Sequence, residues 1–155
     1  IVSLLLAENN IGSAGLQSLT RVVGRCSSLR VLNLSFNSIG DSHTKEFCNQ
    51  LASCRHLERL ELQGNMLGAR GAGELGAVLS SSGVEELRLN VNQLEAQGMR
   101  CMSKLMRACP SLSTLTLRSN DIRDDGARAL CDALILPHRL RALVLSQNNI
   151  GDEGA

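Results

Sequence analysis

Two short segments of this sequence alternate arginine and glutamate around a leucine, an arrangement suited to ion pairing or to binding a charged partner. They read RLE at 59–61 and ELR at 86–88. Residues two apart point to the same side of a strand, so both charges of each segment face one surface. Two interpretations remain open. The charges form cross-strand ion pairs, each contributing little when exposed, or they form a polar patch on which a partner docks.

Residues that catalysis or metal binding would need are present, but the sequence does not group them. His43, His56 and His138 fall at unrelated positions, with no Ser, Cys or carboxylate placed beside them as in a catalytic triad or a metal site. The segment GAGELG at 71–76 matches the glycine pattern of a dinucleotide-binding turn, and we interpret the match as a coincidence. We therefore predict no enzyme activity, no cofactor and no metal.

One motif accounts for the spacing of most leucines and for one set of asparagines. It reads LxxLxLxxNx(I/L), with Ile or Val also allowed at the first position, and it starts near residues 1, 29, 57, 84, 112 and 140. Successive copies are 28, 28, 27, 28 and 28 residues apart, and the short interval falls in the loop segment SSSG at 80–83. A period of this length is typical of a solenoid of stacked repeats.

Each repeat combines a strand pattern with a helix pattern. The LxL step has period two and predicts a short strand, and the apolar spacing i, i+3, i+7 that follows, ending in the fifth repeat at Leu134, predicts a helix. Ser13, Asp41, Asp124 and Asp152 are the predicted N-caps. Strands pack about 4.8 Å apart and helices about 8–10 Å apart, so the stack must curve, with strands on the concave wall.

The asparagine of the motif is a polar residue at a core-facing position. A buried amide needs hydrogen-bond partners, so we expect its oxygen and nitrogen to bond the turns of its own and of the adjacent repeat. These residues form a predicted asparagine ladder: Asn9, Asn37, Asn65, Asn92, Asn120 and Asn148.

The six cysteines follow the repeat rather than a paired motif. Cys26, Cys54 and Cys109 share the position just before the strand, and Cys48 and Cys131 share one on the helix. Without a C-x-x-C pair, a zinc or redox site is poorly supported. We interpret the cysteines as small buried apolar residues in a reducing compartment, with a Cys26–Cys54 disulfide as an open alternative.

The repeats resemble the ribonuclease-inhibitor-like subfamily of leucine-rich repeats, for which the 28-residue period and the segments LxLxxNxIG and NNIGDEGA are typical. The resemblance covers essentially the whole chain. It implies an α/β leucine-rich-repeat solenoid over residues 1–155, a horseshoe of about five and a half repeats with parallel strands on the concave face and helices on the convex face. Members such as ribonuclease inhibitor and the C-terminal regions of NOD-like receptors bind other proteins.

Side chains that vary between repeats on the concave wall are the candidate binding residues. Arginine is enriched among the residues that dominate binding energy at protein interfaces. Aromatic side chains are nearly absent from this chain, which contains two Phe and no Trp or Tyr. Base stacking on nucleic acid is therefore poorly supported. The predicted protein-binding residues are Phe36, Arg59, Glu61, Glu86, Arg88, Asn90 and Arg118.

Composition limits the partners further. The net charge is +1 and no apolar run approaches the length of a membrane span, so we expect neither a membrane nor a nucleic acid as partner, and we expect a cytoplasmic location. The chain lacks an initiator Met and opens directly on repeat sequence. We expect an uncapped piece of a longer solenoid, with further repeats or flanking domains at both ends.

Three functions fit such a scaffold. The first is a ligand-sensing or regulatory segment of an intracellular protein of the NOD-like receptor type. The second is a structural repeat of a ciliary or cytoskeletal assembly. The third, least supported because no residue can be assigned to the chemistry, is a module that activates a small GTPase.

Overall fold

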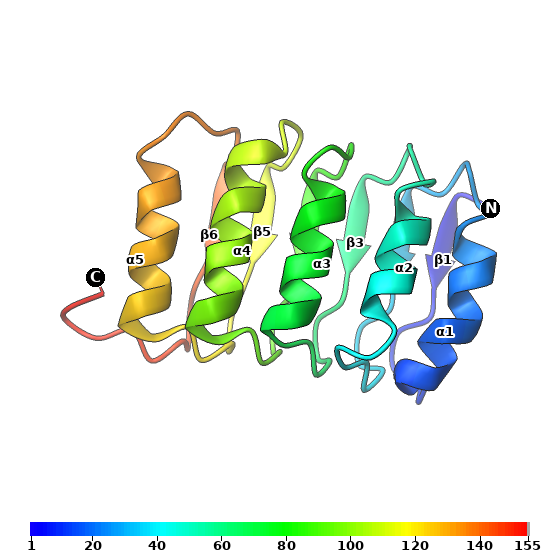
Figure 1. Ribbon diagram of the computed structural model, residues 1–155, viewed down its shortest axis with the longest axis horizontal. Coiled ribbons are helices and arrows are strands. Elements are labelled where there is room, and N and C mark those ends of the chain that lie inside the picture. The colour runs from blue at the N-terminus through cyan, green and yellow to red at the C-terminus, as the bar shows by residue number, and fades with distance from the viewer. Residues whose placement is uncertain (155) are drawn as a thin grey trace.

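The computed structural model describes residues 1–154, in which a strand and a helix alternate along the chain (Figure 1). The helices form one layer and the strands a second layer behind it. The strands are β1 (Ser3–Leu5), β2 (Val31–Asn33), β3 (Arg59–Glu61), β4 (Glu86–Arg88), β5 (Thr114–Thr116) and β6 (Ala142–Val144). The helices are α1 (Gly12–Val23), α2 (Thr44–Leu51), α3 (Ala69–Leu79), α4 (Glu95–Ala108) and α5 (Arg123–Leu134). This is the predicted α/β leucine-rich-repeat solenoid.

The strands form one parallel sheet in the order β1-β2-β3-β4-β5-β6. Each strand returns to the sheet through a helix, which is the connection that parallel strands need. Arg59 of β3 pairs with Glu86 of β4, 27 residues later, whereas Val31 of β2 pairs with Arg59 after 28 residues. The shorter interval therefore leaves the register intact, because the missing residue falls in the loop between α3 and β4.

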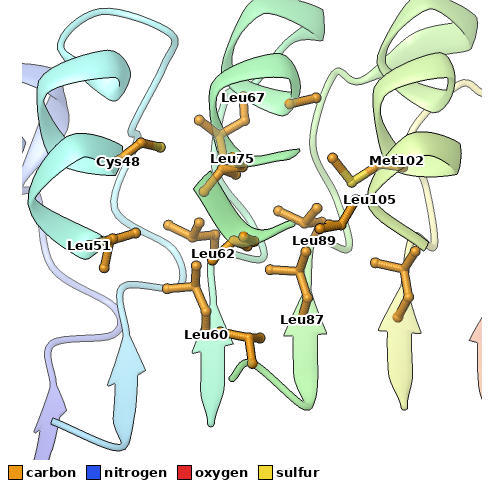
Figure 2. Packing of buried hydrophobic residues seen from close by; sticks show 14 of the residues in the cluster. Cys48, Leu51, Leu60, Leu62, Leu67, Leu75, Leu87, Leu89, Met102 and Leu105 are labelled. Atoms are coloured by element: carbon orange, nitrogen blue, oxygen red, sulfur yellow. The ribbon is translucent and has the colours of Figure 1, made fainter. Parts of the chain in front are cut away.

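The core lies between the two layers and is mostly leucine. Leu60 and Leu87, the central residues of β3 and β4, belong to the same buried cluster as Leu75 of α3 and Met102 of α4 (Figure 2). All four are fully buried. Complete burial of one such side chain stabilises the fold by about 1.5–3 kcal/mol. The repeated leucines therefore hold each strand to its helix.

Glycines let neighbouring helices approach closely. A Cβ on Gly76 of α3 would lie 3.3 Å from the backbone oxygen of Cys101 in α4, and one on Gly126 of α5 would lie 3.1 Å from Cα of Ala96. The segment 71–76, which resembles a dinucleotide-binding turn in sequence, lies wholly inside α3 rather than in a loop between strand and helix. Helix packing explains Gly76, whereas a Cβ at Gly71 would lie 2.5 Å from Oδ1 of Asp41 in the preceding bend.

Three of the predicted N-caps, Ser13, Asp41 and Asp124, are wrong. Ser13 and Asp124 lie within the first turns of α1 and α5, and Asp41 precedes the first residue of α2 by three positions. Asp152 lies in a turn, and the helix that it is predicted to cap falls outside the described residues. The residues that do precede the helices form no side-chain cap hydrogen bond; they are Ile11, His43, Gly68, Leu94 and Ile122.

The same side chains connect consecutive repeats instead. Oδ1 of Asp41 accepts a hydrogen bond of 2.8 Å from the backbone N–H of Gly68, one repeat further on. The equivalent bonds join Gly40 N–H to Ser13 Oγ at 3.1 Å and Gly151 N–H to Asp124 Oδ1 at 2.6 Å.

The interpretation of the cysteines as buried residues needs correction, and exposure is greatest at the end of the stack. Leu134, which ends the predicted apolar spacing of α5, is 38% exposed, because α5 has a neighbouring helix only on its α4 side within residues 1–154. Cys131 on the same helix is exposed, and Cys26 and Cys101 are half-buried, so the interpretation of the cysteines as buried residues fits only the other three.

Candidate functional site

The side chains of the sheet that point away from the helices form two parallel rows. The parallel register aligns the first residue of every strand in one row and the third residue in the other. We call the surface formed by these rows, with the residues that follow each strand, the concave face. The first row is Ser3, Val31, Arg59, Glu86, Thr114 and Ala142, and the second is Leu5, Asn33, Glu61, Arg88, Thr116 and Val144.

Four charged side chains in the middle of this face are paired with one another. Arg59 and Glu86 lie directly opposite across β3 and β4, and Nε of Arg59 approaches the Glu86 carboxylate at 2.6 Å. The same carboxylate accepts a hydrogen bond of 2.6 Å from Nε of Arg88. Arg88 also approaches the buried Glu61 carboxylate at 3.6 Å. Two arginines and two glutamates thus cancel, which leaves the centre of the concave face polar but without net charge.

Asn33 extends this cluster by one strand. Its amide nitrogen donates to Oε2 of Glu61 at 3.3 Å, and its amide oxygen accepts from the backbone N–H of Ser35 at 2.9 Å. Glu61 therefore has partners on both neighbouring strands, which explains how a carboxylate can be only 8% exposed. This cluster is consistent with the ion-pair interpretation of the four charges.

Arg118, the fifth charged side chain predicted for this face, lies outside the cluster. It follows β5 by two residues, is exposed, and forms no salt bridge within residues 1–154. Its Nε donates to Oε1 of Gln147 in the next repeat at 2.9 Å. Its backbone N–H donates at 2.9 Å to Oδ1 of Asn90, whose amide nitrogen lies 3.4 Å from Oε1 of Gln63. Uncharged neighbours thus position the guanidinium and leave its charge unpaired.

Phe36 lies at the edge of the concave face, next to a glycine. It follows β2 by three residues, has a φ of 55°, and remains 47% exposed. Gly64 occupies the same position in the next repeat, and a Cβ there would lie 2.1 Å from Cδ1 of the Phe36 ring. The ring therefore occupies the space that a side chain at Gly64 would fill.

Behind the concave face, asparagine side chains join successive repeats. Asn65 is typical: its nitrogen donates to the carbonyls of Leu34 and Leu62 at 3.0 and 2.9 Å, and its oxygen accepts from Asn37 and Ile39 at 3.1 and 2.9 Å. Asn37, Asn92, Asn120 and Asn148 likewise donate to a carbonyl of the preceding repeat and to one in their own repeat.

Two residues of the asparagine ladder differ from this pattern. Asn9 is exposed and donates only to Leu6 and Ala7 of its own repeat. Asn120 is buried, and its Oδ1 has no hydrogen-bond partner among the described residues. In the preceding repeat Glu95, with a φ of 53°, stands three residues after Asn92, and its N–H donates to the backbone oxygen of Asn120.

The histidines are not brought together. His56 is exposed, His138 is half-buried, and His43 adopts a φ of 64° directly before α2. Over residues 1–154, no group of three or more His, Cys, Asp or Glu side chains is placed to hold a metal ion. In the same part of the chain, no helix combines the length and apolarity needed to cross a membrane.

Sequence reasoning missed the residues that orient Arg118. Gln147 stands in the segment QNNIG, and the corresponding residue of the first repeat, in ENNIG, is Glu8. This difference between glutamine and glutamate at equivalent positions was the signal in the sequence that could have pointed to a role for Gln147. A carboxylate at 147 would pair with Arg118, whereas the amide only orients it.

A family model described as "Leucine Rich repeat" matches residues 25–42, 53–76, 108–131 and 138–155. These ranges include more than half of the chain, so the protein belongs to the leucine-rich repeat family. Its relatives include ribonuclease inhibitor, as the resemblance to ribonuclease-inhibitor-like repeats predicted.

Three curated relatives illustrate this membership. Tonsoku-like protein of Mus musculus is 37% identical over 68% of this chain and 8% of its own length. Ribonuclease inhibitor of Mus musculus is 32% identical over 76% of this chain and 26% of its own length. Protein NLRC5 of Mus musculus is 31% identical over 67% of this chain and 5% of its own length. The chain thus spans about a quarter or less of these relatives.

A solved structure titled "Leiomodin-1 Actin-Binding Site 2 (ABS2)" has a similar fold. It superposes with a TM-score of 0.71, covering 84% of this chain and 76% of that chain, at 14% sequence identity. At that identity the likeness shows a shared repeat fold alone.

Proposed function

We propose that this chain is a non-enzymatic protein-binding segment whose concave face docks a partner protein. Arg118 is the observation that supports this most directly. Arg59 and Arg88 already have carboxylate partners on the face, whereas Arg118 has none within residues 1–154 and is held by Gln147. An exposed, oriented guanidinium suits a carboxylate of a partner, and Arg is one of the residue types that dominate binding hot spots.

The rest of the face supports docking rather than catalysis. Between the recurring leucines of the repeat, the outward side chains change from one repeat to the next while the backbone register stays fixed. A repeat scaffold of this kind offers an extended surface to a partner. The paired centre formed by Arg59, Glu61, Glu86 and Arg88 gives that surface polar groups without strong net charge.

We further propose that the segment is part of a regulatory, cytoplasmic protein of the NOD-like receptor type. The relationship to NLRC5 supports this, as do the free thiols of the buried cysteines Cys48, Cys54 and Cys109, which suit a reducing compartment. The complete reading frame tests this version. A nucleotide-binding P-loop module upstream of the repeats is expected, and a frame without one contradicts the receptor assignment while leaving the binding role intact.

Site-specific photo-cross-linking in cells tests the binding role. Ala142 is exposed in the first concave row, and Lys104 is exposed on α4 in the helix layer. A benzoylphenylalanine at Ala142 is expected to yield a discrete protein adduct, whereas the same group at Lys104 serves as the matched control for the opposite face. Adducts that form equally at both positions, or only at Lys104, contradict a concave docking face.

A further inference from the structure

A narrow strip of side chains runs along the edge of the concave face, just beyond the ends of the strands. We call it the rim strip and define it as Phe36, Gly64, Val91 and Arg118. The backbone continues the parallel hydrogen bonding there: Phe36 N–H donates to Gln63, Gly64 N–H to Asn90, and Val91 N–H to Arg118, at 2.8, 2.8 and 2.7 Å. The strip is therefore as regular as the sheet itself, with steps of about 4.8 Å between repeats.

Three members of the rim strip stand at the same position of their repeats. Phe36, Gly64 and Val91 have φ values of 55°, 65° and 54°, and the equivalent residues of the other repeats, Ser119 among them, also have positive φ. This shared left-handed bend fixes the direction in which each of these side chains leaves the chain. Arg118 stands one position earlier, directly before Ser119, and is joined to the strip because its backbone oxygen accepts from the N–H of Val91.

One end of the rim strip is apolar. Phe36 is 47% exposed and Val91 is 49% exposed. The glycine between them lets the Phe36 ring lie over Gly64, since a Cβ there would overlap the ring. The ring thus extends toward Val91, so that the two apolar side chains flank a position that presents no polar side chain. Covering this surface with an apolar side chain of a partner is favourable, because apolar area is removed from water.

The other end is positive. Arg118 is directly bonded to Val91 through the backbone, and no carboxylate within residues 1–154 pairs with its guanidinium. Gln147 accepts from Nε, which leaves the two terminal amino groups to face a ligand. Oε1 of Gln147 also accepts from the Ser119 hydroxyl at 3.0 Å, which fixes the amide that orients the arginine. Because the group that holds Arg118 is an uncharged amide, the positive charge of the guanidinium remains available to a partner.

The spacing of these two ends limits what can bind. Phe36 and Arg118 are three repeats apart, which corresponds to about 14 Å along the sheet. An extended peptide advances about 3.3 Å per residue, so about three to five residues separate the groups that would meet Phe36 and Arg118. Val91 lies between them and suits a second small apolar side chain.

We propose that the rim strip binds an extended segment of a partner protein in which an apolar side chain lies about three to five residues from an aspartate or glutamate. The apolar side chain packs on Phe36, and the carboxylate pairs with Arg118. This inference rests on the proposed docking role of the concave face and adds the chemistry of the partner. Charge complementarity to the unpaired arginine selects an acidic segment over a neutral or basic one.

A random peptide library displayed on phage and selected on the 155-residue chain tests the partner chemistry. Enriched peptides are synthesised, and their dissociation constants are measured by fluorescence anisotropy for the unmodified chain and for three variants. Arg118→Gln is expected to weaken binding about tenfold or more, and Phe36→Ala about fivefold or more. Arg107→Gln, which removes an exposed arginine of α4, is the matched control and is expected to change the dissociation constant less than about twofold.

Circular dichroism and the unfolding midpoint establish that each variant is folded. Enriched peptides that share an acidic residue and an apolar one at the stated spacing, and that lose affinity with Arg118→Gln, support the proposal. Selection that yields no peptide, or peptides that lack a carboxylate or bind Arg118→Gln equally well, overturns it. Self-association of the chain that Arg118→Gln abolishes also overturns it, because the occupant is then a second copy. An adduct formed at Ala142 would still support the concave face as a docking surface after any of these results. Failure of the rim-strip proposal can therefore be distinguished from failure of the proposed docking function.

Discussion

Asn37 and Asn65 are connected directly: the backbone N–H of Asn37 donates to the side-chain oxygen of Asn65 at 3.1 Å. The same oxygen accepts from Ile39, and the amide nitrogen of Asn65 donates to carbonyls on both sides of the repeat boundary, at Leu34 and Leu62. One buried side chain thus satisfies backbone groups of two repeats. Since those groups are out of reach of water, the asparagine is a structural cross-link between repeats.

Replacement of Asn65 by alanine is expected to lower the free energy of unfolding by about 1–3 kcal/mol, because buried backbone groups lose their partners. Urea denaturation followed by circular dichroism measures the change. Asn9→Ala is the matched control, since Asn9 is exposed and bonds only within its own repeat. Equal effects at both positions would show that the inter-repeat bonds add nothing to stability.

The side chain of Asp41 also connects two repeats, and its removal is expected to lower the free energy of unfolding. Asp41→Ala leaves the backbone N–H of Gly68 without the carboxylate that now accepts from it at 2.8 Å. We expect a loss of about 1–2 kcal/mol in the free energy of unfolding, measured as above. Asp125→Ala removes a carboxylate that only pairs with Arg128 on the surface, and should cost less than about 0.5 kcal/mol. An Asp41 variant as stable as the Asp125 variant contradicts this role.

Gly64→Ala is expected to destabilise the fold for two reasons, and Phe36 supplies one of them. Gly64 has a φ of 65°, a left-handed conformation that costs an alanine about 1 kcal/mol. A Cβ at Gly64 would also lie 2.1 Å from Cδ1 of the Phe36 ring, so the ring must move. Gly64→Ala should therefore shift the Phe36 ring resonances in a proton NMR spectrum and lower the free energy of unfolding by about 1 kcal/mol or more. In a Phe36→Ala background the cost should be smaller, because only the backbone contribution remains; a cost unchanged in that background would mean that the contact with the ring contributes nothing.

The buried thiol of Cys48 is expected to make the free energy of unfolding depend on pH in the alkaline range. Burial, with a smaller contribution from the Glu74 carboxylate, raises the pKa of its thiol from 9.0 to about 12. Above pH 9.0 the unfolded chain loses this proton while the folded chain keeps it, so the contribution of Cys48 to stability is complete below pH 9.0 and falls as pH rises toward 12. The slope is up to about 1.4 kcal/mol per pH unit.

The difference in unfolding free energy between the unmodified chain and Cys48→Ala isolates this effect from other titrating groups. That difference should change steadily above pH 9.0 in favour of the alanine variant. A difference that is independent of pH would mean that the folded and unfolded thiols titrate alike.

The sequence was sufficient to predict the repeat architecture because the leucines that face the core recur at fixed intervals, and their periodicity directly reports strand and helix. It was insufficient for the helix starts. Ser13, Asp41 and Asp124 have the right residue types for caps, but a tertiary contact with the next repeat determines where their side chains bond. Local sequence does not contain that information.

The candidate site shows the same division. The register that places Arg59 opposite Glu86 follows from the repeat length, so the charged cluster could be anticipated from the sequence. The environment of Arg118 could not be anticipated in this way. It depends on the side-chain amide of Gln147, which lies 29 residues away in the sequence and accepts from the guanidinium without pairing its charge. The 38% exposure of Leu134 could not be predicted either, because helical periodicity does not reveal whether a neighbouring helix is present.

The most direct test of the docking account is the yield of the protein adduct formed in cells by benzoylphenylalanine at Ala142, compared between chains with and without Arg118→Gln. Loss of the unpaired guanidinium is expected to lower the yield about tenfold, whereas Arg107→Gln on α4 should leave it unchanged. An adduct whose yield survives Arg118→Gln, in a variant with an unaltered unfolding midpoint, would contradict the claim that Arg118 anchors a partner on the concave face.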